Sequence, residues 1–325
     1  MIKVGVVGAA GYVGGEMCRL LLLHPDVDFV FAQSSSSAGQ PLYSIHEDLF
    51  GATSMLFSEG VDTSVDVLFL CSGHGKSLKF LEANELQEQC VVIDLGNDFR
   101  LAKDAVSAGR SFAYGLSDYF GDQVVKCRNV ANPGCFATAI QSAILPLAAA
   151  NILCDEVHIT AITGSTGAGQ SPSATTHFSW RANNLSTYKT FTHQHLGEIG
   201  ESVVKLQPSF DGAINFVPYR GDFPRGIIAT VHTKCDKSLD EVVELFEKQY
   251  SASPFTFVSP KPINLKQVVN TNRTLLHIEK HGEYLLITSV IDNLLRGAAG
   301  QAIENMNRIF GMPLTTGLNL KASAF

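Results

Sequence analysis

The start of the chain combines an apolar strand, a glycine-rich turn, an apolar helix and a second strand. Residues 2–7 read Ile-Lys-Val-Gly-Val-Val, glycines follow at positions 8, 11 and 14, and a helical pattern over residues 16–23 ends before Pro25. Residues 28–32 are typical of the next strand. This order of elements binds dinucleotides in α/β proteins. We therefore expect a Rossmann-type domain; the alternative is a structural turn that binds nothing.

Each glycine of the turn has a separate expected role. Gly8 permits the tight turn, Gly11 lets the backbone approach a pyrophosphate, and Gly14 lets the helix pack closely on the strand. The phosphates would then lie at the N-terminus of the helix, where free N–H groups attract anions.

The end of the second strand indicates which dinucleotide is bound. An acidic side chain at this place bonds the ribose hydroxyls of NAD and repels a 2′-phosphate. Here Gln33 is followed by four serines, and Asp28 lies at the opposite end of the strand. NADP is therefore favoured, with Ser34 and Ser36 on the 2′-phosphate. The alternative is a flexible serine-rich loop, since residues 33–39 contain no arginine.

Length and composition agree with a soluble enzyme. At roughly 150 residues a domain, 325 residues indicate about two domains. A net charge of −7 gives no electrostatic basis for binding nucleic acid or an anionic membrane. We find no export signal and no apolar run of about 18 residues, and expect a cytoplasmic protein. The seven cysteines form no CxxC pair, so neither a disulfide framework nor a metal site is expected.

The pattern of strands changes after the first third of the chain. Residues 65–71 and 90–95 are nearly continuous apolar strands, which is typical of a parallel sheet. In contrast, residues 156–163, 226–232, 274–279 and 284–290 alternate between polar and apolar, as in an antiparallel sheet with one solvated face. We expect an α/β protein with a Rossmann domain over residues 1–134, completed by a C-terminal helix at 298–325. Residues 135–297 would form an α+β catalytic and oligomerisation domain with a largely antiparallel sheet.

A cysteine stands between a turn and the start of an apolar helix. Cys135 follows Pro133 and Gly134, and the free N–H groups and dipole of the helix would favour its thiolate. The alternative is a small buried hydrophobe. Beside a nicotinamide cofactor, a thiolate indicates transfer of hydride to an acyl group, because a thioester is more electrophilic than a carboxylate.

The segment from Thr192 to Ile199 is the strongest candidate for a proton donor. It pairs His193 and His195 with Glu198, which is placed to orient one imidazole. The alternatives are a hydrogen-bonded surface pair and a metal site, although the latter lacks a clear third ligand.

Seven segments together resemble the N-acetyl-γ-glutamyl-phosphate reductase family of arginine biosynthesis. They occur in family order at residues 8–14, 92–101, 114–116, 132–135, 164–169, 193–198 and 291–302. The resemblance implies an NADP-binding Rossmann domain, an α+β catalytic domain and a homo-oligomer, either a dimer or a tetramer. It also implies reduction of a small acyl phosphate with NADPH through a cysteine thioester.

The resemblance assigns roles to individual residues. It implies that Cys135 is the nucleophile, that His195 is the acid/base and that Arg100 receives the acyl phosphate; we expect His193 and Glu198 to face the substrate as well. The residues expected at the cofactor from the turn and the serine loop are Gly8, Ala10, Gly11, Tyr12, Val13, Gly14, Ser34 and Ser36, and the resemblance adds Asn293 and Gly297. The alternatives are a salt bridge from Arg100 to Asp94 or Asp98, a solvated charge at Glu198 and a plain helix start at 293–300.

Departures from the family pattern leave the acyl group open. They are Leu196 and Gly197, residues 72–75, Gln170 and Arg296. They lie in or near segments that would shape the ligand pocket, and a related branch uses an N-succinyl substrate. The rival interpretations are aspartate-semialdehyde dehydrogenase, a zinc hydrolase on a similar scaffold and an NADP-sensing regulator.

Overall fold

The computed structural model describes residues 1–323, and the chain divides into two compact units. The first unit comprises Met1–Gly134 and Ala298–Asn319. The second comprises Cys135–Gly297 and the end of the chain after Asn319. Residues 324–325, the last two of the C-terminal helix expected at 298–325, lie outside the described residues.

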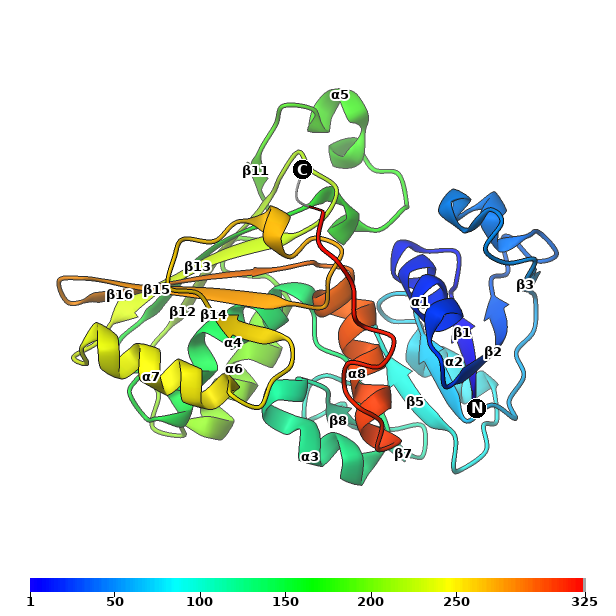
Figure 1. Ribbon diagram of the computed structural model, residues 1–325, viewed down its shortest axis with the longest axis horizontal. Coiled ribbons are helices and arrows are strands. Elements are labelled where there is room, and N and C mark those ends of the chain that lie inside the picture. The colour runs from blue at the N-terminus through cyan, green and yellow to red at the C-terminus, as the bar shows by residue number, and fades with distance from the viewer. Residues whose placement is uncertain (324–325) are drawn as a thin grey trace. The chain divides into compact units, whose positions relative to one another are not determined.

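The first unit is built on a parallel sheet with the strand order β3-β2-β1-β4-β5-β9-β8 (Figure 1). Its strands are β1 (Ile2–Val7), β2 (Val27–Gln33), β3 (Phe57–Ser58), β4 (Val67–Leu70), β5 (Val91–Asp94), β8 (Ala113–Tyr114) and β9 (Val130–Ala131), with a small hairpin of β6 (Val106–Ser107) and β7 (Arg110–Ser111). Its helices are α1 (Tyr12–Leu23), α2 (Ser77–Ala83), α3 (Ser117–Cys127) and α8 (Gly300–Ile309). The order reverses at β1, which is where such sheets bind ligands.

The glycine turn has the geometry that the sequence predicts. Gly8 has a φ of +77°, and a Cβ there would lie 2.6 Å from the backbone nitrogen of Ser72. A Cβ on Gly14 would lie 2.5 Å from the carbonyl oxygen of Gly8, whereas one on Gly11 would meet nothing closer than 3.7 Å. The carbonyl of Gln33 accepts hydrogen bonds from the N–H groups of Gly8 and Ala9, at 3.0 and 2.9 Å. The turn is thus joined to the end of β2.

The second unit is a mixed sheet with helices α4, α6 and α7 along one face (Figure 1). The strand order is β11-β12-β10-β13-β16-β15-β14, and four of the six pairings among the described strands are antiparallel. The strands are β10 (Val157–Thr163), β11 (Ser186–Thr187), β12 (Ile214–Arg220), β13 (Ile227–Lys234), β14 (Thr256–Val258), β15 (Thr274–His281) and β16 (Tyr284–Ile291). The helices are α4 (Cys135–Ala149), α5 (Phe178–Arg181), α6 (His195–Leu206) and α7 (Leu239–Tyr250).

Helix α4 is the core of the second unit. Every residue between Cys135 and Ala149 is buried, because the helix is apolar on all sides and packs on both α6 and the sheet. The expected α/β class, with a Rossmann-type sheet and a largely antiparallel second sheet, is confirmed. Among the described residues, no helix is both long and apolar enough to cross a membrane.

The structure corrects the expected C-terminal helix at 298–325. A π-helical turn at Leu295–Ala299 leads into α8, which ends at Ile309. The helix stops there because Gly311 has a φ of +68° and Pro313 cannot continue a helix. The chain beyond it has no helix among the described residues.

We predict different effects on the free energy of unfolding for two alanine substitutions in the glycine turn. Gly14→Ala adds helix propensity worth about 1 kcal/mol, but its Cβ meets backbone that cannot move aside. It should therefore lower the free energy of unfolding by about 1–3 kcal/mol. Gly11→Ala, whose Cβ has ordinary contacts, should change it by less than about 0.5 kcal/mol. Equal unfolding free energies of the two variants in urea titrations would contradict the close packing of Gly14.

Candidate active site

Cys135 is the first residue of α4, is partly exposed and forms no disulfide within the described part of the chain. Gly297 packs directly against it: a Cβ on Gly297 would lie 2.7 Å from the Cβ of Cys135. Any other side chain at position 297 would displace the cysteine or its helix. The structure thus gives Gly297, predicted from the sequence to contact the cofactor, a packing role beside Cys135.

The segment that carries Gly297 is fixed by Asp292, whose carboxylate is fully buried. One carboxylate oxygen accepts from Arg225 Nε at 3.0 Å and from Asn270 N at 2.8 Å, and the other accepts from Leu294 N at 2.8 Å. The Asp292 carbonyl accepts from Gly297 N at 2.9 Å. These bonds hold the backbone that Cys135 contacts.

His193 and His195 lie together at the start of α6, and both are buried. Their ring centroids are 4.6 Å apart, and the ring of Phe136, next to Cys135 in α4, lies 5.5 Å from His193 and 6.3 Å from His195. The Nδ1 atom of His193 accepts a hydrogen bond from His195 N at 3.3 Å. The structure therefore brings both histidines to the helix that begins with Cys135, which a surface pair would not do.

Glu198 lies one helical turn after His195, with 3.8 Å between its Oε1 and the Nε2 of the imidazole. Its side chain is 3% exposed, so the alternative of a solvated charge is wrong. A buried carboxylate at this distance stabilises an imidazolium. Within residues 1–323, no group of three or more His, Cys, Asp or Glu side chains is arranged to hold a metal ion.

Sequence reasoning missed Tyr188 and Arg220. Tyr188 packs edge-on against His193, with 5.7 Å between ring centroids. Burial and, next in size, the charge of Cys135 raise the pKa of Tyr188 to about 12. The guanidinium of Arg220 lies over the Tyr188 ring, 4.6 Å from its centroid. The available signal was Arg220 itself, because it is a cation at the carboxyl end of a strand. That strand was not recognised because it contains Pro218.

Arg100 is buried in the first unit. Its Nε donates to the carbonyl of Asn132 at 2.8 Å and its Nη2 donates to the carbonyl of Leu95 at 3.3 Å. Of the two proposed ion-pair partners, Asp94 accepts from Ser77 and Gly96 and also interacts with the charge of Arg100, while Asp98 accepts from Gly75 N and Leu78 N. Arg100 thus supports the strand end that leads toward Cys135, and its contact with phosphate stays a prediction.

The cofactor candidates fall in both units. In the first, Ser34 is buried and its hydroxyl lies 3.3 Å from that of Ser36, which is exposed; both follow Gln33, which bonds the glycine turn. In the second, the Asn293 amide accepts from Gly226 N at 2.7 Å and donates to Thr166 Oγ1 at 3.0 Å. The Asn293 side chain therefore links the loops that carry Gly226 and Thr166. The contacts of these residues with a cofactor stay predictions.

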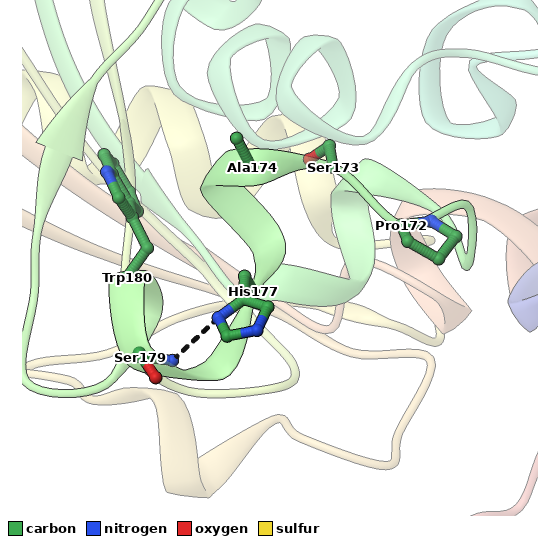
Figure 2. A pocket seen from close by; sticks show the side chains of 6 residues that line it. All are labelled: Pro172, Ser173, Ala174, His177, Ser179 and Trp180. Atoms are coloured by element: carbon green, nitrogen blue, oxygen red, sulfur yellow. Dashed lines mark hydrogen bonds between the residues drawn. The ribbon is translucent and has the colours of Figure 1, made fainter.

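A separate pocket of about 730 Å³ opens on the segment between β10 and β11. It is lined by Pro172, Ser173, Ala174, His177, Ser179 and Trp180 (Figure 2). The only hydrogen bond drawn among these residues runs from Ser179 N to His177 Nδ1, at 3.3 Å (Figure 2). Since neither Cys135 nor the histidine pair lines this pocket, it is not the site described above.

Two family models cover nearly the whole chain. Residues 3–126 match the semialdehyde dehydrogenase NAD binding domain, and residues 135–293 match the semialdehyde dehydrogenase dimerisation domain. The aspartate semialdehyde dehydrogenase II from Vibrio cholerae has a similar fold, with a TM-score of 0.74 over 96% of this chain and 99% of that chain. At 18% identity, this likeness concerns the fold alone.

Curated relatives are much closer in sequence. The N-acetyl-gamma-glutamyl-phosphate reductase of Flavobacterium johnsoniae is 54% identical over 325 residues, and that of Phocaeicola vulgatus is 49% identical over 326 residues. Both alignments cover 100% of this chain and 100% of the relative. The chain therefore belongs to the N-acetyl-gamma-glutamyl-phosphate reductase family of the semialdehyde dehydrogenases.

Proposed function

We propose that this protein reduces N-acetyl-L-glutamyl 5-phosphate to N-acetyl-L-glutamate 5-semialdehyde with NADPH, in arginine biosynthesis. The observation that carries the proposal is Cys135 at the first residue of buried helix α4, beside the His193–His195 pair, in a chain that matches reductases of that name along its full length. The test is phosphate-dependent reduction of NADP by N-acetyl-L-glutamate semialdehyde, followed by absorbance. An enzyme that turns over aspartate semialdehyde instead would contradict the proposed substrate.

The proposed reaction begins at the Cys135 thiolate, which attacks the γ-carbonyl of the acyl phosphate. A C–S bond forms, the N–H groups at the start of α4 hold the oxyanion, and the C–O bond to phosphate breaks. Arg100 is the proposed partner of the departing phosphate, since its fork of donors suits that geometry. A thioester on Cys135 remains.

The second half of the reaction returns the thiol. The cofactor, when bound, supplies a hydride for the thioester carbon. Hydride addition leaves an oxyanion on the carbon that is bonded to sulfur. As this oxyanion becomes the aldehyde C=O, the C–S bond breaks and protonated His195 donates its proton to the departing sulfur. Glu198, 3.8 Å from His195 Nε2, stabilises the charged imidazole.

The glycine turn fits a dinucleotide. A Cβ added to Gly11, at the start of α1, would make only ordinary contacts, so the backbone there is open to a pyrophosphate. Gly8 and Gly14 are instead packed closely against backbone atoms. The Ser34 and Ser36 hydroxyls beside this turn suit the 2′-phosphate of NADP, and no carboxylate follows β2 to repel it.

We also propose a cytoplasmic homo-oligomer. None of the seven cysteines, all of which lie in the described residues, forms a disulfide, which suits a reducing compartment and a thiolate mechanism. The face of the second sheet that lies away from α4 carries half-buried Ile162, Ile228 and Leu286, an apolar surface of the kind that subunits cover.

We predict that Cys135→Ser abolishes turnover but leaves NADPH affinity near that of the wild type. The serine alkoxide is far harder to generate than the thiolate at neutral pH. Cys154→Ser, which changes an exposed thiol of the same unit, is the matched control and should keep full activity. Turnover of Cys135→Ser above about 5% of the wild-type rate would rule out the covalent route.

Substitutions of the two histidines should affect different kinetic constants. His195→Asn should lower kcat about 100-fold or more, the range of general acid/base catalysis. His193→Asn, which keeps an acceptor near Nδ1, should mainly raise KM because it removes binding shared by ground and transition states. Exposed His281→Asn serves as the control. A reversed pattern would assign the proton transfer to His193, and two nearly silent variants would place the donor elsewhere.

We predict a preference for NADP over NAD in kcat/KM and in binding followed by cofactor fluorescence. Ser34→Asp should move both toward NAD, because a carboxylate repels the 2′-phosphate and bonds the ribose hydroxyls. Ser36→Asp tests the same charge at an exposed position, and Ser64→Asp, on another loop, controls for net charge. Equal efficiency of the wild type with both cofactors would contradict the assignment of the serine loop.

A further inference from the structure

Arg220 presents a buried hydrogen-bond donor near the nucleophile. It is the last residue of β12, opposite Thr163 of β10 and Ser186 of β11. Its Nε is buried and has no hydrogen-bond acceptor among the described residues. Buried polar groups are nearly always satisfied, so an orphaned guanidinium donor points to an acceptor that arrives with a ligand.

Tyr188 connects this guanidinium to the reacting centre. Arg220 stacks on its ring at 4.6 Å, and the ring also packs on His193. The Cys135 charge raises the pKa of Tyr188, which places the tyrosine within electrostatic reach of the thiolate. Ring contacts thus lead from Arg220 through Tyr188 and His193 to Phe136, the residue next to Cys135.

A second arginine supports the first. Arg181 is buried at the end of α5, and its Nη1 donates to the carbonyl of Arg220 at 2.6 Å and to that of Asn184 at 3.3 Å. Its Nε and Nη2 donate to the carbonyl of Thr175 at 3.3 and 3.2 Å. Arg181 is thus held by backbone carbonyls rather than by a carboxylate partner.

The two guanidinium charges act on each other. Burial and, second, the Arg220 charge lower the pKa of Arg181, while the Asp222 carboxylate opposes this effect. Asp222 is exposed and also accepts from Asn183 N. Two cations with one solvated carboxylate leave a local positive charge, which an anionic ligand would stabilise.

We propose that Arg220, stacked on Tyr188 and supported by Arg181, binds a carboxylate of the substrate and determines which acyl amino acid the enzyme accepts. This inference rests on the proposed function. An N-acylglutamyl phosphate always carries an α-carboxylate, and an acyl group derived from a dicarboxylic acid carries a second. Either can receive paired N–H bonds from a guanidinium. The phosphate, at the reacting end, has Arg100 as its proposed partner.

The test compares Arg220→Met with the wild type in the semialdehyde-oxidising direction. The substrates are the semialdehydes of N-acetylglutamate, of its α-carboxamide and of N-succinylglutamate. Arg273→Met is the matched control, because Arg273 also stacks on a ring, that of Phe257, at the opposite end of the sheet. Arg220→Met should raise KM for the preferred substrate about 10- to 100-fold, the loss expected for charge-assisted hydrogen bonds, with kcat within about threefold. Arg273→Met should leave KM unchanged.

The three substrates distinguish the two carboxylates. If Arg220 binds the α-carboxylate, the wild type rejects the α-carboxamide by the same factor, and Arg220→Met no longer separates acid from amide. If it binds a carboxylate on the acyl group, the wild type prefers the N-succinyl substrate and Arg220→Met loses that preference. Unchanged KM for all three substrates, or a raised KM for inorganic phosphate alone, would overturn the proposal.

A second measurement does not depend on turnover. N-Acetyl-L-glutamate and N-succinyl-L-glutamate should protect Cys135 from iodoacetamide, detected as the adduct mass, and Arg220→Met should weaken that protection by the same factor. Arg220→Lys keeps the charge, so its KM and its protection of Cys135 should lie between those of the wild type and Arg220→Met. Such intermediate values would show that the loss in Arg220→Met does not come from a folding defect. If the wild type turns over none of the semialdehydes, the proposed function fails. If it turns them over and Arg220→Met matches it in both assays, only the role of Arg220 fails.

Discussion

The contact between Gly297 and Cys135 is the constraint on which the site depends. It joins two segments that are far apart in the sequence, and it works only because position 297 has no side chain. The burial of Asp292 fixes one partner, and the burial of α4 fixes the other. Cys135, the proposed nucleophile, is held between two such rigid parts and would need little reorganisation during the reaction, which is a large share of what enzymes contribute to rate.

Strands β1, β2, β4 and β5, the glycine turn and helix α1 of the first unit could be predicted from the sequence, because their signals are local. Gly8, Gly11 and Gly14 each have the packing expected of them, and residues 2–7 form β1 as predicted. A turn between a strand and the next helix is decided by neighbours in the chain. Only the C-terminal helix was overextended, since apolar residues beyond Ile309 continue the pattern that Gly311 and Pro313 interrupt.

The second unit was harder because its site is made by pairing across distance. Strand β12 escaped notice since Pro218 lacks the N–H of a central strand; it is tolerated because β11 is short and leaves that part of β12 near the sheet edge. Because β12 was not predicted, Arg220 was not recognised either. Its contact with Tyr188 depends on the register of β11 and β12. Asn293 was recognised as special, but no pattern in the sequence shows that its amide bonds Gly226 and Thr166.

The closeness of Cys135 and Gly297 has a consequence for how such a chain is assembled from parts. These two residues are the first and last of the continuous stretch that forms the second unit. Its ends therefore meet, as in a module inserted into a loop of a host protein. A different insert with equally close ends would leave the host strands and their glycine turn undisturbed. Cys135 and the two histidines lie within this one stretch of chain, whereas the glycine turn lies outside it.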